Sequence, residues 1–435
     1  MATEGLALTA EVAARGKLSA VRAHFYHDPY AHHFVPHSAR ERSLGAMINS
    51  GQYARVAAIG SVVEQFMAAV GGGCGQIVSL GAGFDTRFWS LHASALAPAC
   101  YVEIDQECVV QRKASIVASS PELLRALPEG RACCGGKGIA SAHYKCLAAD
   151  LTDITALERA LAIAGWVPTV PTLVIAECLL VYMKAEEAAA LLRWFSERCQ
   201  CAAFAAYEQV ACPAGSAASR APRSAALGFC SQVEPDDPFG QMMVRNLDER
   251  GCPLLGIHAC PTVTAQKQRA IDLGWSHAEA MDIAHFFHHV FTKAERRRIR
   301  RLEMLDEVEE FELFLHHYCV MLAKKDEASE HLFDSLTLSR PIDRPPIDAE
   351  KQAVYSSAPV CQTHSPLTMP GSGLCDAHQT QSAREQSMPL LPVTNICETE
   401  DDLDHTPDWC KDKADQGVSC GEYEGYSPTS DHSHP

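Results

Sequence analysis

Hydrophobic positions between residues 77 and 207 fall into short runs that alternate with longer amphipathic stretches. The short runs have strand length and lie at Ile77–Leu80, Tyr101–Asp105, Tyr144–Ala148, Thr172–Ala176 and Ala202–Tyr207. Apolar residues recur at helical spacing between the later runs, over Ile154–Ala164 and Ala185–Arg198. Regular β-α alternation predicts an α/β protein with a doubly wound, mostly parallel, Rossmann-like sheet that binds ligands at the carboxyl ends of its strands.

The regions on either side of this pattern differ from it. The first 70 residues read as helical, with one long amphipathic segment from Gln52 to the glycines that follow Val70. Residues 211–234 are rich in Ala, Ser, Pro and Gly, which predicts a flexible insertion. Regular structure is expected to resume at Phe239, followed by one charged helix over 293–315 and a closing strand over 317–322.

Composition changes again beyond Lys325, where Pro, Ser, Asp, Thr and His replace periodic apolar positions. We therefore expect a disordered tail over residues 326–435. Residues 71–325 form the predicted core, and residues 1–70 the predicted helical lid on the substrate side.

Charge and cysteine usage exclude some classes of protein. The net charge of −17 over 435 residues argues against a general nucleic-acid binder, because phosphate contacts need a surplus of Lys and Arg. A run of about 18 apolar residues, which a membrane span would need, does not occur, and the first residues lack the pattern of a signal peptide. The 19 cysteines are scattered without Cys-x-x-Cys pairs, which favours reduced thiols in a cytoplasmic protein.

The segment Ile77-Val78-Ser79-Leu80-Gly81-Ala82-Gly83-Phe84-Asp85-Thr86-Arg87 runs from an apolar strand into two glycines. Glycine lets a loop backbone lie against a ligand. The third glycine of the dinucleotide fingerprint is missing, which disfavours a pyrophosphate cofactor. The segment resembles the first motif of S-adenosylmethionine-dependent methyltransferases.

Two carboxylates follow strands at positions where a nucleoside could bind. Asp105 comes roughly 20 residues after the glycine loop, where an acidic side chain can accept both ribose hydroxyls; an ordinary turn aspartate is the alternative, and Glu103 is the second choice. Asp150 could accept the adenine amino group beside an apolar wall formed by Leu151. Alternatively it is a helix N-cap, a role that Asp153 fills equally well.

Three further side chains are candidates for contacts with a ligand. Glu177 ends a buried strand and needs a partner there, either a ligand amino or sulfonium group or a structural arginine. Arg55 lies on an apolar helical face, where its planar fork suits a carboxylate, although a salt-bridged arginine is the commoner case. Tyr182 is either a functional phenol or a packed aromatic.

Neither group of histidines, His27, His32 and His33 or His285, His288 and His289, has the spacing of metal ligands with a carboxylate partner. We therefore expect no metal site. The arginines at 296–301 and the acidic residues at 303–310 read as a solvated helix face.

Several motifs in order resemble the leucine carboxyl methyltransferase family. They are Tyr26-His27-Asp28-Pro29-Tyr30, Tyr53-Ala54-Arg55-Val56, Leu80-Gly81-Ala82-Gly83-Phe84-Asp85-Thr86, Ala149-Asp150-Leu151, Ala176-Glu177-Cys178-Leu179-Leu180-Val181-Tyr182-Met183, Tyr207-Glu208-Gln209-Val210 and Phe239-Gly240-Gln241-Met242. The resemblance implies that S-adenosylmethionine is the cofactor and that Arg55 holds its carboxylate. It also implies cofactor contacts from Gly81, Gly83, Asp105, Asp150, Leu151 and Glu177. The family has a further lysine before the first motif; here the ungapped position is Ala23, and Arg22 replaces it if one residue is inserted.

The activity implied by this resemblance is methylation of the C-terminal leucine α-carboxylate of the protein phosphatase 2A catalytic subunit, with Arg55 and Tyr182 orienting the acceptor. We expect a cytoplasmic monomer that binds the phosphatase tail. Two other readings stay open. One is a methyltransferase for another carboxylate, on a tRNA base or a small molecule, although the acidic charge and the lack of a kelch repeat disfavour tRNA. The other is a non-catalytic phosphatase-binding adaptor.

Overall fold

The computed structural model of the chain describes residues 2–71, 73–127, 131–133, 138–210, 238–326 and 331–343. The chain divides into two compact units, Met1–Val360 and Cys361–Pro435, and the described residues all belong to the first. The predicted insertion at 211–234 and the predicted tail from residue 344 onward lie outside the described residues.

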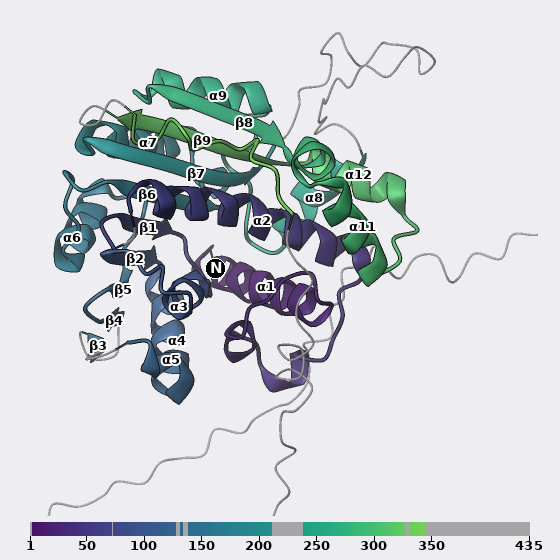
Figure 1. Cartoon of the computed structure of the whole chain (residues 1–435), viewed down its shortest axis with the longest axis horizontal. Helices are drawn as coiled ribbons and strands as arrows, with labels where there is room; N and C mark the ends of the chain where they lie inside the picture. Colours follow the sequence, from purple (N-terminus) through teal and green to yellow (C-terminus); the bar gives the residue numbers. More distant parts are fainter. Residues whose placement is uncertain are drawn as a thin grey trace, which may run out of the picture. The chain divides into compact units, whose positions relative to one another are not determined.

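Nine described strands form one mixed sheet in the order β3-β4-β5-β2-β1-β6-β7-β9-β8 (Figure 1). Their bounds are β1 Gln76–Leu80, β2 Cys100–Asp105, β3 Arg131–Cys133, β4 Gly138–Ala140, β5 Tyr144–Ala148, β6 Thr172–Glu177, β7 Cys201–Gln209, β8 His277–Asp282 and β9 Tyr318–Asp326. The pairs joining β5, β2, β1, β6 and β7 are parallel, and the pairs toward both edges are antiparallel. The predicted mostly parallel α/β sheet is confirmed.

The register of the central strands brings three predicted site residues to one edge of the sheet. Leu80 of β1 pairs with Ile104 of β2 on one side and with Ala176 of β6 on the other. The residues that follow these three positions are Gly81, Asp105 and Glu177. Because parallel strands end at the same edge, their side chains and backbone groups lie at a common level.

Helices cover both faces of the sheet. Their bounds are α1 Ala2–Arg22, α2 Ala46–Ala69, α3 Arg87–Ala93, α4 Glu107–Ala118, α5 Pro121–Arg125, α6 Ile154–Ala164, α7 Ala185–Arg198, α8 Pro238–Glu249, α9 Val263–Asp272, α10 Ile283–His285, α11 Lys293–Leu302 and α12 Val308–His316. Short 3-10 turns lie at η1 Ala31–Phe34, η2 His37–Ala39 and η3 Leu180–Tyr182, and a π-helical turn at Phe286–Val290.

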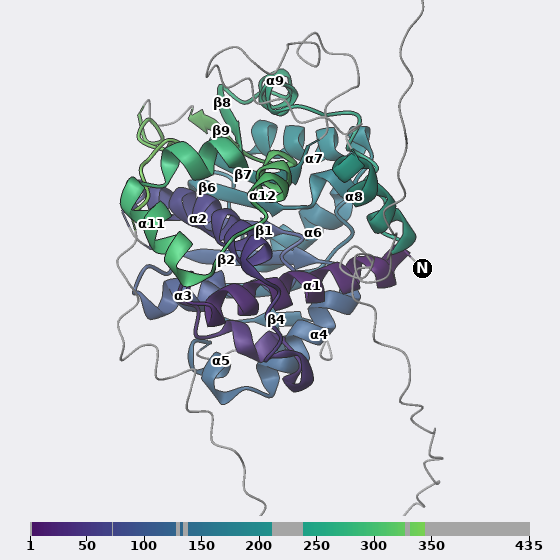
Figure 2. The same ribbon diagram turned by 90° about the vertical axis from the view of Figure 1, so that its right-hand side faces the viewer.

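Alternate strand residues pack into two separate apolar clusters, as a sheet covered on both faces requires. Ile77 of β1 packs in the cluster that contains residues of α1–α4, α11 and α12, whereas Val78 packs in the cluster that contains residues of α6, α7 and α9. Figure 2 shows α2 and α11 on one side of the central strands and α6 and α7 on the other. The doubly wound arrangement is therefore present.

The prediction of one helix over 293–315 is wrong, because the chain forms α11 and α12 with residues 303–307 between them. Basic residues end α11, and carboxylates occupy the first turn of α12. Cations stabilise a helix C-terminus and anions an N-terminus, so this charge pattern marks the end of one helix and the start of the next. The predicted closing strand is longer than expected and extends to Asp326.

Part of the predicted disordered tail packs against the core. Residues 331–343 bury four apolar side chains, Phe333, Leu336, Leu338 and Ile342, in the same cluster as α1 and α2. The Nζ of Lys324 donates to the carbonyl oxygen of Leu336 at 2.8 Å. The boundary predicted after Lys325 is therefore too early. Among the residues that the structure describes, none of the helices has the length and apolar character needed to cross a membrane.

Candidate functional site

Two glycines turn the chain at the carboxyl end of β1. Both adopt left-handed backbone angles, with φ of 59° for Gly81 and 53° for Gly83. The Gly81 N–H donates to the carbonyl oxygen of Ile104 at 2.8 Å, and the Gly83 N–H donates to Oδ2 of Asp105 at 2.6 Å. A Cβ on Gly81 would lie 3.0 Å from Cδ1 of Leu179. Glycine is therefore needed here both for the backbone angle and for the close approach.

The predicted ribose-binding residue Asp105 lies beside this loop, and burial raises the pKa of its carboxyl group. The second choice, Glu103, is fully buried beneath the site, where its Oε2 accepts from Nζ of Lys113 at 2.5 Å and from the Tyr144 hydroxyl at 2.7 Å. Glu103 is thus part of the core. The neighbouring Gln106 has a buried Oε1 without a hydrogen-bond partner among the described residues.

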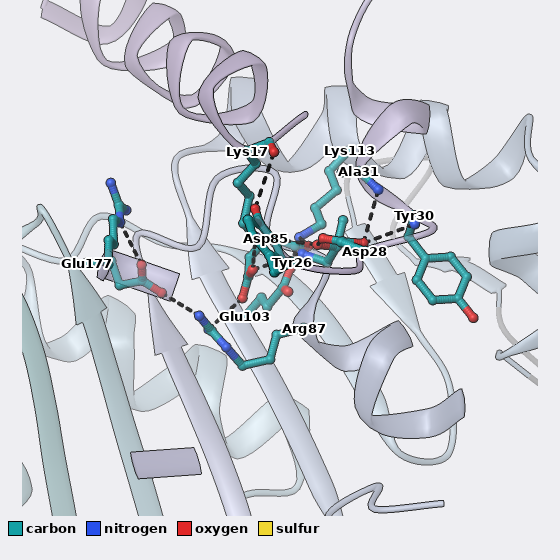
Figure 3. A network of polar contacts seen from close by, with 12 residues as sticks. Lys17, Tyr26, Asp28, Tyr30, Ala31, Asp85, Arg87, Glu103, Lys113 and Glu177 are labelled. Carbon is teal, nitrogen blue, oxygen red and sulfur yellow. Dashed lines mark hydrogen bonds and ion pairs between the residues drawn. The ribbon is translucent and has the colours of Figure 1, made fainter. Parts of the chain in front are cut away.

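A row of five charged side chains of alternating sign crosses the edge of the sheet, and we call it the charge row. Nζ of Lys17 contacts Oδ1 of Asp85 at 2.5 Å, and Oδ2 of Asp85 contacts Arg87 at 2.7 Å. Arg87 contacts Glu177 at 2.7 Å, and Glu177 contacts Nε of Arg55 at 2.7 Å. Figure 3 shows Asp85 between Lys17 and Arg87. The row joins α1, the glycine loop, α3, β6 and α2 at one place.

Burial opposes the ionisation of both carboxylates in this row, yet the neighbouring cations outweigh it. Arg87, Lys17 and Lys113 hold the pKa of Asp85 far below its ordinary value. Glu177 is also buried, and its two arginine partners lower its pKa. Both carboxylates are therefore ionised at neutral pH. Three cations face two anions in the charge row.

The structure places Lys17, and not Arg22, in the charge row. Arg22 is exposed in the last turn of α1, whereas Lys17 is largely buried on the same helix. Lys17 lies on the helix face that carries the buried residues Ala14, Leu18 and Val21. A cation on an apolar helical stripe is the signal that pointed to Arg55, and it also marks Lys17, which sequence reasoning missed. Asp85 and Arg87 were missed as well, although they lie two and four residues after Gly83.

The motif at residues 26–30 ties α1 to the glycine loop. Oδ2 of Asp28 accepts from the Thr86 hydroxyl at 2.5 Å, and the Tyr26 hydroxyl donates to the carbonyl oxygen of Lys17 at 3.3 Å. The other oxygen of Asp28 accepts two backbone N–H groups of its own turn, as Figure 3 shows. This motif therefore fixes the position of Lys17 relative to the loop after β1.

Asp150 and Leu151 follow β5, and the structure distinguishes between the two interpretations of Asp150. Asp153 is the residue that caps α6, with its side chain accepting from the Thr155 N–H at 2.9 Å. Asp150 is exposed, and its Oδ1 accepts from both the N–H and the hydroxyl of Thr152. Leu151 is buried. The N-cap role thus belongs to Asp153, which leaves Asp150 available for a ligand.

The two predicted acceptor-side residues have different surroundings. The Arg55 guanidinium lies 5.4 Å from the ring centroid of Tyr207, in a cation–π contact. Tyr182 ends η3 and packs against a small apolar cluster that includes Val181, Leu254 and Ile257. Burial raises the pKa of Tyr182 far above its ordinary value, so its phenol stays protonated.

Among the described residues, His32, His33 and Glu122 offer three possible metal-ligand atoms within 4.8 Å of one another. His33 already contacts Glu122 through Nε2 at 3.0 Å and the Ser120 hydroxyl through Nδ1 at 3.3 Å. These hydrogen bonds account for the arrangement without a cation, and the charge row contains no metal-binding set of ligands.

The model of the family described as leucine carboxyl methyltransferase matches residues 7–196. The chain is 35% identical to the leucine carboxyl methyltransferase 1 homolog of Arabidopsis thaliana over 319 residues, 73% of this chain and 88% of that protein. It is 34% identical to leucine carboxyl methyltransferase 1 of Rattus norvegicus over 326 residues, 74% of this chain and 90% of that protein. The chain belongs to the leucine carboxyl methyltransferase family.

The predicted family and the predicted class of enzyme, a protein carboxyl methyltransferase, are thereby confirmed. The matched range contains the charge row, the glycine loop, Asp105, Asp150 and Tyr182. The chain is also 33% identical to the tRNA wybutosine-synthesizing protein 4 of Homo sapiens over 335 residues, which is 74% of this chain but 44% of that protein.

Proposed function

We propose that this enzyme transfers the methyl group of S-adenosylmethionine to the C-terminal leucine α-carboxylate of the protein phosphatase 2A catalytic subunit, forming a methyl ester. The observation that carries the proposal is the charge row, which lies beside the glycine loop and inside the part of the chain that matches the family.

The residues at this edge have the chemistry that S-adenosylmethionine requires. Its amino-acid end carries one cation and one carboxylate, and the charge row offers both signs within one contact of each other. Its nucleoside needs hydrogen-bond acceptors, which Asp105 and the unpartnered buried Oε1 of Gln106 provide. Positive φ at the two glycines gives the open backbone that such a ligand lies against.

Each residue then has a defined role. Arg55 and Lys17 bind the carboxylate of the cofactor, and Glu177 accepts from its amino group. Asp105 accepts from the ribose hydroxyls, and Asp150 from the adenine amino group. When bound, S-adenosylmethionine supplies an electrophilic methyl group on a positively charged sulfur.

The acceptor carboxylate needs no general base, because its pKa near 3.5 keeps it ionised at neutral pH. The enzyme therefore acts by holding the acceptor in line and by excluding water that would shield it. Arg55 and Tyr182 orient the acceptor. The first 70 residues act as the lid. A Cβ added to Gly83 would lie 3.4 Å from the Cβ of Ala10 on α1, so α1 lies directly over the glycine loop.

The test is methyl transfer from labelled S-adenosylmethionine to the intact phosphatase 2A catalytic subunit, beside a form that lacks its terminal leucine. We expect label on the intact protein alone, and its release by mild base as an ester requires. If neither protein is labelled although calorimetry shows cofactor binding, the acceptor is a different carboxylate, and the tRNA substrate suggested by the human relative becomes the next to assay. Absence of cofactor binding would favour the non-catalytic adaptor.

A further inference from the structure

A second buried carboxylate, Glu208 of β7, holds the loop that follows Glu177. Its side chain is nearly inaccessible, with the residue 1% exposed. Oε1 accepts from the N–H groups of Leu179 and Leu180 at 3.2 and 2.9 Å, and Oε2 accepts from the N–H of Val181 at 3.2 Å. Three consecutive backbone donors thus converge on one carboxylate.

The loop so held, residues 178–182, begins with a strained residue. Cys178 has a φ of 53°, a left-handed angle in which its Cβ crowds the following carbonyl oxygen. Its N–H donates to the carbonyl oxygen of Tyr207 at 2.6 Å. From the other side, the Gly256 N–H donates to the carbonyl oxygen of Val181 at 2.8 Å. This strained turn is therefore kept in place by its surroundings, and Glu208 supplies most of the acceptors.

The loop links the cofactor side of the site to the acceptor side. Glu177 of the charge row precedes it directly, and Tyr182, the proposed acceptor-orienting phenol, ends it. Leu179 also lies against the turn at Gly81, as its approach to a Cβ there shows. A shift of the loop would therefore move Tyr182 relative to Glu177.

Several ionisable groups face Glu208 from the elements packed around it. They are Cys178 and Tyr182 in the loop, Cys319 on β9, Cys260 before α9 and Arg269 on α9. Burial raises the pKa of Glu208 to about 7, against the opposing effects of the three backbone N–H groups and Arg269. The three cysteines of this set and the tyrosine have raised pKa values, so they stay neutral while Glu208 titrates.

We propose that Glu208 is a positioning residue for methyl transfer, whose ionised carboxylate holds residues 178–182 in the arrangement that aligns Tyr182 with the charge row. The inference rests on the proposed function, because the acceptor is what Tyr182 orients. Protonation turns one oxygen of Glu208 from an acceptor into a hydroxyl that faces a backbone N–H. With the proton on Oε2, the loop loses the bond from the Val181 N–H and keeps the two bonds to Oε1.

Glu208→Gln tests this inference, because an amide has the shape of a protonated carboxyl group and likewise one good acceptor oxygen. The loss of one bond to a charged acceptor predicts a kcat about tenfold below wild type at pH 8.5. Wild-type activity should decline through pH 7 and meet that of the variant by about pH 5.5, where both side chains are neutral. The Kd for S-adenosylmethionine should stay within about threefold, since the direct cofactor contacts are kept. A wild-type to variant ratio that does not change with pH would overturn the proposal.

The position of the loop can also be measured without the reaction. Cys178 is partly exposed, so its alkylation rate, read by peptide mass spectrometry, divided by that of exposed Cys74 and compared at equal thiolate fraction, reports loosening of the loop. We expect this normalised rate to be several-fold higher in Glu208→Gln than in wild type at pH 8.5, and equal rates would contradict the inference. Because this readout needs no acceptor, it separates failure of the loop anchor from failure of the proposed function.

One control variant and one measurement on the wild-type protein guard against a simple folding defect. Glu295→Gln removes an equally buried carboxylate whose hydrogen bonds go to Tyr53 and Arg298 and not to residues 178–182. It should lower Tm without changing the normalised Cys178 rate. If Glu208→Gln does not fold, hydrogen exchange of the Leu179, Leu180 and Val181 amides in wild type gives the answer: their protection should fall as pH drops below 7, and constant protection overturns the proposal.

Discussion

Replacing Lys17 with methionine tests which cation of α1 binds the cofactor carboxylate. The structure points to Lys17, whereas the sequence alone pointed to Arg22. Lys17 and Arg22 lie on one helix, five residues apart, but only Lys17 contacts Asp85 in the charge row. Arg22→Met is therefore a matched control, with the same helix, the same lost charge and the same new side chain. If Lys17 binds the cofactor carboxylate, the two variants will differ strongly in affinity.

The magnitude follows from the burial of the contact. The Lys17 and Asp85 side chains are 15% and 9% exposed, so water screens their interaction little. A hydrogen bond to a charged group contributes about 1.5–3 kcal/mol, which corresponds to a Kd for S-adenosylmethionine raised about 10- to 150-fold. An exposed substitution such as Arg22→Met changes free energies by about 0.5 kcal/mol or less, a factor of about two.

The fold should survive the loss of Lys17, because Asp85 keeps its ion pair with Arg87 and Lys113 still donates to the Asp85 carbonyl oxygen. Calorimetric titration with S-adenosylmethionine gives both Kd values, and thermal unfolding confirms that each variant is folded. The reasoning is refuted if Arg22→Met weakens cofactor binding as much as Lys17→Met does.

Three further predictions concern other parts of the site. Arg55→Ala should raise the Kd for S-adenosylmethionine about 10- to 150-fold, since it removes a similar charged contact, and an unchanged Kd in calorimetry would remove Arg55 from the cofactor site. Gly256→Ala should lower the free energy of unfolding by about 1–3 kcal/mol, because its Cβ would lie 3.0 Å from the carbonyl oxygens of residues 180 and 183. Gly16→Ala should not lower it, because a Cβ there meets only the flexible end of Gln52. Equal urea midpoints for the two variants would count against the argument. Burial keeps Glu208 protonated in the folded state up to about pH 7, while the unfolded chain releases the proton near pH 4.3. The free energy of unfolding should therefore fall by up to about 4 kcal/mol as pH rises between these values. Urea unfolding of Glu208→Gln should lack this part of the pH dependence; identical profiles for the two proteins would show that Glu208 does not titrate in this range.

The sequence predicted the central sheet well because strand ends in a parallel sheet are marked locally. Apolar runs that stop at a polar residue located β1, β2 and β6, and with them Asp105 and Glu177. β8 was missed for a physical reason. Among the described strands it lies at the edge of the sheet and pairs with β9 alone. It exposes part of one face, so its sequence carries no apolar run.

The charge row shows what a linear pattern leaves out. Sequence reasoning gave Glu177 either a ligand or a structural arginine as its partner, and the structure supplies two arginines from α2 and α3. Arg87 is 90 residues from Glu177 along the chain, and Lys17 is 68 from Asp85. Such pairings depend on how α1, α2 and α3 pack on the sheet, which a motif does not encode. The apolar residues of 331–343 escaped notice for a similar reason: they are irregularly spaced, and only their packing in the cluster with α1 and α2 makes them core residues.

The excess positive charge of the charge row affects which acceptor the proposed site favours. The protein carries a net charge of −17, which repels an acidic partner at long range, yet three cations face two anions at the proposed site. Fixed positive charge in a partly buried site attracts an anionic ligand, and salt weakens that attraction less than it weakens the exposed surface charges. A substrate offering a single terminal carboxylate should therefore be favoured over one whose charge is spread along an acidic tail. Raising the ionic strength should weaken the repulsion at the surface more than it weakens binding at the site. The KM for the protein acceptor should therefore fall or stay constant. A steep rise of KM with salt would instead place the attraction on the outer surface.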